Sequence, residues 1–177
     1  MKTTLRRYVR SQGGFTLVEV IVASAIGLIV MTGLTSVVLT SWRAWVTATS
    51  RVEASSAIRN FQFESNDDFA LSSLPVPPGC GTSASNQCST QPIPLQGSQF
   101  NKSGAVSAYQ VTYSWDKATG HLLRQIGANP PREAATNVSA FSWYVDGSTQ
   151  AVVATISVTV QSYTQTQTLR FYTHVNP

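Results

Sequence analysis

The longest apolar stretch of the chain lies close to its N-terminus. Val20 to Leu39 consists of Val, Ile, Leu, Ala and Met with scattered small polar residues and no proline. As a helix this stretch would be about 30 Å long, which is close to the thickness of a bilayer's hydrocarbon core. We therefore predict a membrane-spanning helix that extends to about residue 39.

The hydrophobic pattern stays helical beyond this span. Trp45, Val52, Ile58 and Phe61 recur at helical spacing, so we predict that they share one broad apolar face. Four charged side chains near them are expected to face solvent: Arg43, Arg51, Glu53 and Arg59. The prediction is one long helix over residues 15–65, with a membrane half and an amphipathic half. The segment 65–68 is expected to end it or to start a short second helix through Leu74, with Asp67 and Asp68 solvated.

Proline and glycine interrupt the pattern between Leu74 and Gly97. Five of the eight prolines fall here, and because proline fixes φ and lacks a donor, we predict a loop. Cys80 and Cys88, the two cysteines of the chain, lie in it. In an exported domain such a pair favours a disulfide over a metal site or free thiols. Closing this short loop would restrict the unfolded chain by roughly 2–3 kcal/mol.

From Val106 onward polar and apolar residues alternate with a period of two, which predicts strands. Turn signals lie at 116–120 and at Asp146-Gly147. The predicted strands cover residues 106–115, 121–126, 138–145, 151–160 and 168–175. Since all links are short, they should form one antiparallel meander. The predicted fold class is α+β, with a long N-terminal helix packed on an antiparallel β-sheet.

Charge is concentrated at the N-terminus. The chain has 12 basic and 8 acidic residues, and Lys2, Arg6, Arg7 and Arg10 precede the apolar run without any acid. The positive-inside rule therefore places the N-terminus in the cytoplasm. Removing residues 1–14 leaves 8 basic and 8 acidic residues. Nucleic-acid binding is thus possible but not indicated by charge.

Glu19 is the one charged residue between Arg10 and Arg43. An acid deep in a membrane helix costs roughly 2–3 kcal/mol on insertion scales, so it needs a partner and a role. A secretory signal peptide cut near Ala23-Ser24-Ala25 is the alternative, but that cut would split the apolar run.

Gly14-Phe15-Thr16-Leu17-Val18-Glu19, behind a basic leader and before an apolar helix, resembles the class III signal of type IV pilins and type II secretion pseudopilins. The resemblance implies that a prepilin peptidase cuts between Gly14 and Phe15 and that Phe15 becomes N-methylated. The expected domains are a cytoplasmic leader (1–14), a long helix (15–65) and an exported globular domain (66–177).

Cleavage would make Glu19 the fifth residue of the mature chain and create an amine on Phe15. That amine is largely cationic at neutral pH and attracts a carboxylate strongly in hydrocarbon. We therefore expect Glu19 to recognise the Phe15 amine of an adjacent subunit during assembly. The partners implied are the prepilin peptidase, other pilin or pseudopilin subunits and an inner-membrane assembly platform.

The segment from Asp116 to Arg124 also resembles minor pilins and J-type pseudopilins, less specifically. The expected function is a minor pilin-like structural subunit of a type IV pilus or related fibre. The alternatives are a type II secretion pseudopilin and a membrane-tethered extracytoplasmic binding module. The expected location is the inner membrane, with one span, and then the periplasm or a cell-surface fibre.

Catalytic motifs are absent from the sequence. It contains no Gly-x-Ser-x-Gly, no phosphate-binding glycine loop and no HExxH. His121 and His174, the two histidines, fall in predicted strands and are interpreted as surface or half-buried residues. We expect no enzymatic activity, no cofactor and no metal.

Overall fold

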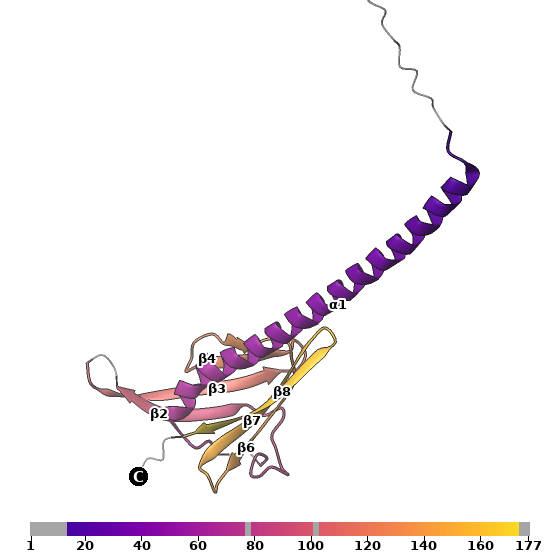
Figure 1. The fold of residues 1–177 in the computed structure, drawn as a ribbon. Coiled ribbons are helices and arrows are strands. Elements are labelled where there is room, and N and C mark those ends of the chain that lie inside the picture. Colours follow the sequence, from indigo (N-terminus) through magenta and orange to yellow (C-terminus); the bar gives the residue numbers. More distant parts are fainter. Residues whose placement is uncertain (1–13, 77–78, 101–102, 174–177) are drawn as a thin grey trace, which may run out of the picture. The chain divides into compact units, whose positions relative to one another are not determined.

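The computed structural model describes residues 14–76, 79–100 and 103–173. Within these residues, one helix, α1 (Leu17–Ala70), is followed by eight strands, most of which are labelled in Figure 1. The chain divides into two compact units at Trp45 and Val46, and each is described by itself. Helix α1 continues through the predicted end at 65–68, and no second helix forms there. The reason is that Asp68 and Phe69 in its last turn are buried and held by the globular unit.

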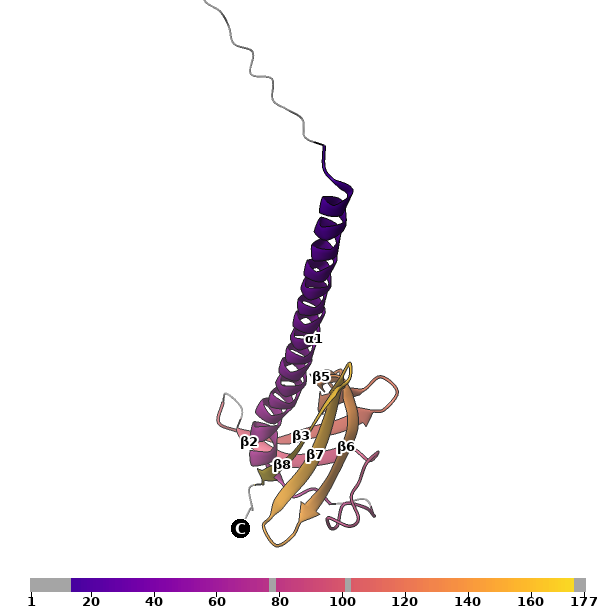
Figure 2. The same cartoon turned by 45° about the vertical axis from the view of Figure 1, so that its right-hand side comes forward.

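The strands form two antiparallel sheets, seen in a second view in Figure 2. The five-stranded sheet has the order β1-β2-β3-β4-β5 and the three-stranded sheet β6-β7-β8. The bounds are β1 (Ser72–Ser73), β2 (Ile93–Phe100), β3 (Val106–Asp116), β4 (His121–Ile126), β5 (Arg132–Ala135), β6 (Val138–Asp146), β7 (Ala151–Val160) and β8 (Tyr163–Tyr172). The α+β prediction of a long helix on antiparallel sheet is confirmed, whereas the prediction of a single meander is wrong.

The division into two sheets occurs between β5 and β6. Asn137 there has a φ of 58°, a left-handed conformation that asparagine tolerates better than most residues. It redirects the chain, and Val138 then donates a hydrogen bond to the carbonyl of Gly120 at 2.8 Å. The prediction of a loop from Leu74 to Gly97 is wrong at its end, where β2 begins at Ile93 and Pro94 pairs opposite Thr112. The end of the last predicted strand, at 174–175, lies outside the described residues.

The second half of α1 packs on the sheets through one stripe. Its buried residues recur every three or four positions: Ser50, Ala54, Ala57, Ile58, Phe61, Ser65, Asp68 and Phe69. The predicted Ile58 and Phe61 belong to this stripe, but Trp45 and Val52 do not, since they are 62% and 70% exposed. The buried stripe instead includes the small residues Ser50, Ala54 and Ala57. Arg51, Glu53 and Arg59 are exposed, as predicted.

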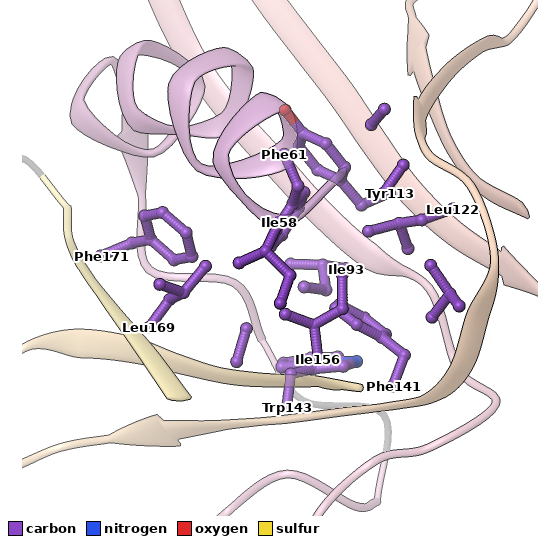
Figure 3. Packing of buried hydrophobic residues seen from close by; sticks show 14 of the residues in the cluster. Ile58, Phe61, Ile93, Tyr113, Leu122, Phe141, Trp143, Ile156, Leu169 and Phe171 are labelled. Carbon is purple, nitrogen blue, oxygen red and sulfur yellow. The ribbon is translucent and has the colours of Figure 1, made fainter. Parts of the chain in front are cut away.

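Phe61 of α1 is a fully buried member of the core (Figure 3). Its ring makes edge-to-face contacts with Tyr113, Phe141 and Phe171, with centroids 5.6, 5.9 and 5.8 Å away. Tyr113 comes from the five-stranded sheet and the two phenylalanines from the three-stranded sheet. One helical side chain therefore holds both sheets, with aromatic pairs each contributing about 0.5–1.5 kcal/mol beyond their burial.

Gly97 lets the segment that follows α1 lie directly against β2. Ser72 in β1 pairs opposite Gly97 in β2. A Cβ at position 97 would lie 2.0 Å from the carbonyl oxygen of Leu71. Only glycine therefore permits this approach of the segment after α1 to the sheet.

Candidate processing and assembly site

Thr16 accepts the first backbone hydrogen bonds of α1. The backbone N–H of Glu19 donates to the Thr16 carbonyl at 3.0 Å and to its Oγ1 at 3.3 Å, and the Val20 N–H donates to the same carbonyl at 3.2 Å. Thr16 is thus the N-cap and Glu19 the third helical residue, the spacing of a capping box. Sequence reasoning missed this role, although Thr-x-x-Glu before an apolar run is its signature.

Glu19 lies in the first turn of the helix, where unpaired backbone N–H groups favour a negative charge. Its side chain is exposed and lines a surface hollow with Phe15, Val20, Ala23 and Ser24. The structure therefore places Phe15 and Glu19, two predicted site residues, at one hollow of the N-terminal unit. The acid remains accessible to a second molecule.

Gly14 and Phe15 precede the helix. Both are exposed, and Phe15 is 81% exposed. A Cβ added to Gly14 would meet nothing within 4 Å. The described fold therefore has room for a side chain at this position. The leader residues 1–13 lie outside the described residues.

Hydroxyl groups inside the apolar span are satisfied within the helix. Ser24 donates to the carbonyl of Val20, and Thr35 to that of Met31, both at 2.8 Å. Thr32, Ser36 and Thr40 donate in the same way to carbonyls three or four residues earlier. Such bonds remove the need for water, so these residues are compatible with a hydrocarbon environment. By length and composition, α1 qualifies as a membrane-crossing helix.

Cys80 and Cys88 form the predicted disulfide. Cys88 is 1% exposed and exchanges two backbone hydrogen bonds with Trp143 of β6, at 2.9 and 2.8 Å. Gly81 also accepts a hydrogen bond from the Val145 N–H at 2.8 Å. Cys88 belongs to the core beside Trp143, so the bridge ties the proline-rich loop to the core.

Asp68 is a second feature that the sequence did not indicate. It was expected to be solvated, yet it is 1% exposed. Arg124 of β4 donates to both carboxylate oxygens, from Nε and Nη2, at 2.6 Å each. Tyr113 donates to Oδ2 at 2.5 Å, and Tyr109 donates to Oδ1. The last turn of α1 is thereby tied to β3 and β4.

Ionisation of this group follows from its partners. Burial opposes the charged form of Asp68, but the hydrogen bonds from Arg124, Tyr109 and Tyr113 outweigh it, so the pKa of Asp68 is lowered. Burial and the bond to Asp68 raise the pKa of Tyr109 to about 12 and raise that of Tyr113 further. The network therefore holds a carboxylate, a guanidinium and two neutral phenols, which is a structural tie.

His121 is a half-exposed strand residue, as predicted, with its Nδ1 2.9 Å from Glu133 Oε1. His174 lies outside the described residues. Within the described part of the chain, no three His, Cys, Asp or Glu side chains gather as a metal site would require.

Comparison with known proteins adds one finding. Residues 9–35 match the family model described as the prokaryotic N-terminal methylation motif. No curated protein and no solved structure gives a match. The motif, together with the long apolar helix, is consistent with a type IV pilin-like protein, a family that is structural rather than catalytic. It implies processing by a prepilin peptidase and assembly with other pilins, and suggests a membrane-anchored protein.

Proposed function

We propose that this chain is a minor pilin-like subunit of a type IV pilus or a related fibre, cut between Gly14 and Phe15 and N-methylated on Phe15. The observation that carries the proposal is the match to the methylation motif directly before an apolar helix. The exposed Gly14–Phe15 bond and the absence of any steric need for glycine support cleavage there. The protein would start in the inner membrane and end in a fibre.

Glu19 is proposed to set the register between subunits. Its carboxylate is exposed at the first turn of an otherwise uncharged segment. In hydrocarbon an unpaired carboxylate is costly, and the new Phe15 amine of a neighbouring subunit would neutralise it. Leaving either group unpaired is unfavourable, so the pair selects one stagger even where its net stabilisation is small.

The capping role of this turn must be separated from the assembly role. Glu19→Ala removes the carboxylate and should leave insertion and cleavage intact but prevent entry into fibres. Glu19→Gln should be intermediate, because it keeps an acceptor and loses the charge. Thr16→Ala is the matched control, since it removes the side-chain cap of the same turn and keeps Glu19, at a cost of about 1 kcal/mol in helix stability.

The assay is the fraction of processed protein recovered in sheared fibres from the native host. The proposal expects wild-type recovery for Thr16→Ala and little for Glu19→Ala. Equal recovery of processed Glu19→Ala and wild type would remove Glu19 from the assembly mechanism.

A pseudopilin of a type II secretion system is the second candidate, because the same motif and the same Glu19 chemistry serve it. Deleting the gene separates the two: loss of piliation, motility or DNA uptake supports the pilus subunit, and loss of protein secretion supports the pseudopilin. A membrane-tethered binding module requires no cleavage. Recovery of the uncut chain would therefore favour that function.

A further inference from the structure

A pocket of about 310 Å³ opens where β4 and β5 meet their connecting loop. It is lined by Arg124, Ile126, Asn129, Pro130 and Arg132. None of these residues belongs to the processing and assembly site, and the pocket lies within the globular unit. Its lining combines two cations with one amide side chain.

The strand register places the two cations opposite each other. Arg124 and Arg132 are direct partners in the antiparallel β4–β5 pair. Residues in such a pair share one face of the sheet, and like charges there destabilise the pairing. The arrangement is unfavourable unless negative charge is supplied between them.

Among the described residues, a carboxylate pairs with only one of these two arginines. Asp68 is bound by Arg124 through two hydrogen bonds, so its single charge is already matched. Arg132 is exposed and forms no ion pair with any described carboxylate. The neighbouring Glu133 pairs with His121 at 2.9 Å, and adjacent strand residues point to opposite faces.

Arg124 is also held in place before any ligand arrives. Its Nε and Nη2 atoms are fixed by Asp68, and Nη2 lies 3.4 Å from the Tyr109 hydroxyl. These bonds use one edge of the guanidinium, so the Nη1 group stays available for another acceptor. A preorganised donor loses little freedom on binding.

We infer that this pocket binds a tetrahedral oxyanion of the phosphate type, either as the free ion or as the terminal phosphate of a larger molecule. Two guanidinium groups and the Asn129 amide can donate from different sides to three or more oxygens, as a phosphate offers. A carboxylate has two coplanar oxygens, which one guanidinium satisfies. The inference is independent of fibre assembly.

The test is calorimetric titration of the full-length protein in an uncharged detergent with inorganic phosphate, glycerol 3-phosphate and acetate at equal ionic strength. Phosphate should bind, and Arg132→Gln should weaken it at least tenfold. Lys117→Gln, which removes one exposed cation from the β3–β4 turn, is the matched control and should change affinity less than twofold. Unchanged near-UV circular dichroism shows that each variant is folded.

Binding of both phosphates supports a site for a terminal phosphate, and binding of inorganic phosphate alone supports a site for the free ion. Three results would overturn the inference: no phosphate binding by the wild type, equal weakening by the two substitutions, or acetate binding as tightly as phosphate.

Discussion

Replacing Asp68 with asparagine should destabilise the globular unit strongly. The substitution keeps the shape but leaves Arg124, whose side chain is 19% exposed, without its counter-ion. Removing one member of a buried ion pair costs about 3–5 kcal/mol. For a unit the size of residues 46–177, 3 kcal/mol corresponds to a fall in Tm of about 10 °C.

The same network predicts an acid-dependent loss of stability. The pKa of Asp68 is lower in the folded protein than the ordinary value of about 3.9 expected in the unfolded chain. The unfolded state therefore binds the proton more readily. The contribution is present above pH 4 and is lost as the pH falls toward the folded pKa. Asp68→Asn should abolish that part of the pH dependence.

The assay is chemical denaturation of the full chain in detergent, followed by near-UV circular dichroism, between pH 3 and pH 7. Asp67→Asn is the matched control, because Asp67 is the adjacent carboxylate and is exposed. It should change the free energy of unfolding by less than about 0.5 kcal/mol. A loss below 1 kcal/mol for Asp68→Asn, or equal losses for the two variants, would refute the assignment of Asp68 as a structural tie.

Two further substitutions test the packing. Gly97→Ala should lower the Tm, because its Cβ would lie 2.0 Å from the Leu71 carbonyl oxygen and the backbone must shift, at a cost of about 1–3 kcal/mol. Gly147→Ala, whose Cβ meets nothing within 4 Å, is its control, and equal Tm values would contradict the close approach. Reducing the Cys80–Cys88 bond should lower the free energy of unfolding by roughly 2–3 kcal/mol. A reductant should leave a Cys80→Ser, Cys88→Ser double variant unchanged, and an unchanged wild type would show that the bridge adds no stability.

Local chemistry explains which parts of the fold the sequence predicts. The turn at 116–120 forms because Asp116 Oδ1 accepts the Ala118 N–H at 2.9 Å and Gly120 takes a φ of 71°. Asp146 accepts the Ser148 N–H at 3.1 Å in the same way. The hydrogen bonds of both turns join residues only two positions apart. The sequence of each turn is therefore enough to predict it.

The features that the sequence did not predict depend on distant partners. Burial of Asp68 requires Tyr109, Tyr113 and Arg124, which lie 41 to 56 positions away. The stripe of α1 that faces the core was misassigned at Val52 because small residues such as Ala54 and Ala57 carry weak hydrophobic signals. The chain passes from one sheet to the other at Asn137, a left-handed residue that no periodic pattern marks.

At the candidate site, the sequence motif identified the candidate residues but not how they are arranged. Glu19 stood out because it is the one charge in an apolar segment. That Thr16 caps the same turn became clear from the hydrogen bonds. The pocket between Arg124 and Arg132 depends on strand register, which neither composition nor periodicity fixes.

Whether this chain is a processed, pilin-like subunit is decided by the mass of its N-terminus. The protein should be extracted from membranes of its native host and its N-terminal peptide analysed by mass spectrometry. We expect a chain that begins at Phe15 with one added methyl group on the α-amine. A chain that begins at Met1, or one cut after Ala25, would contradict it.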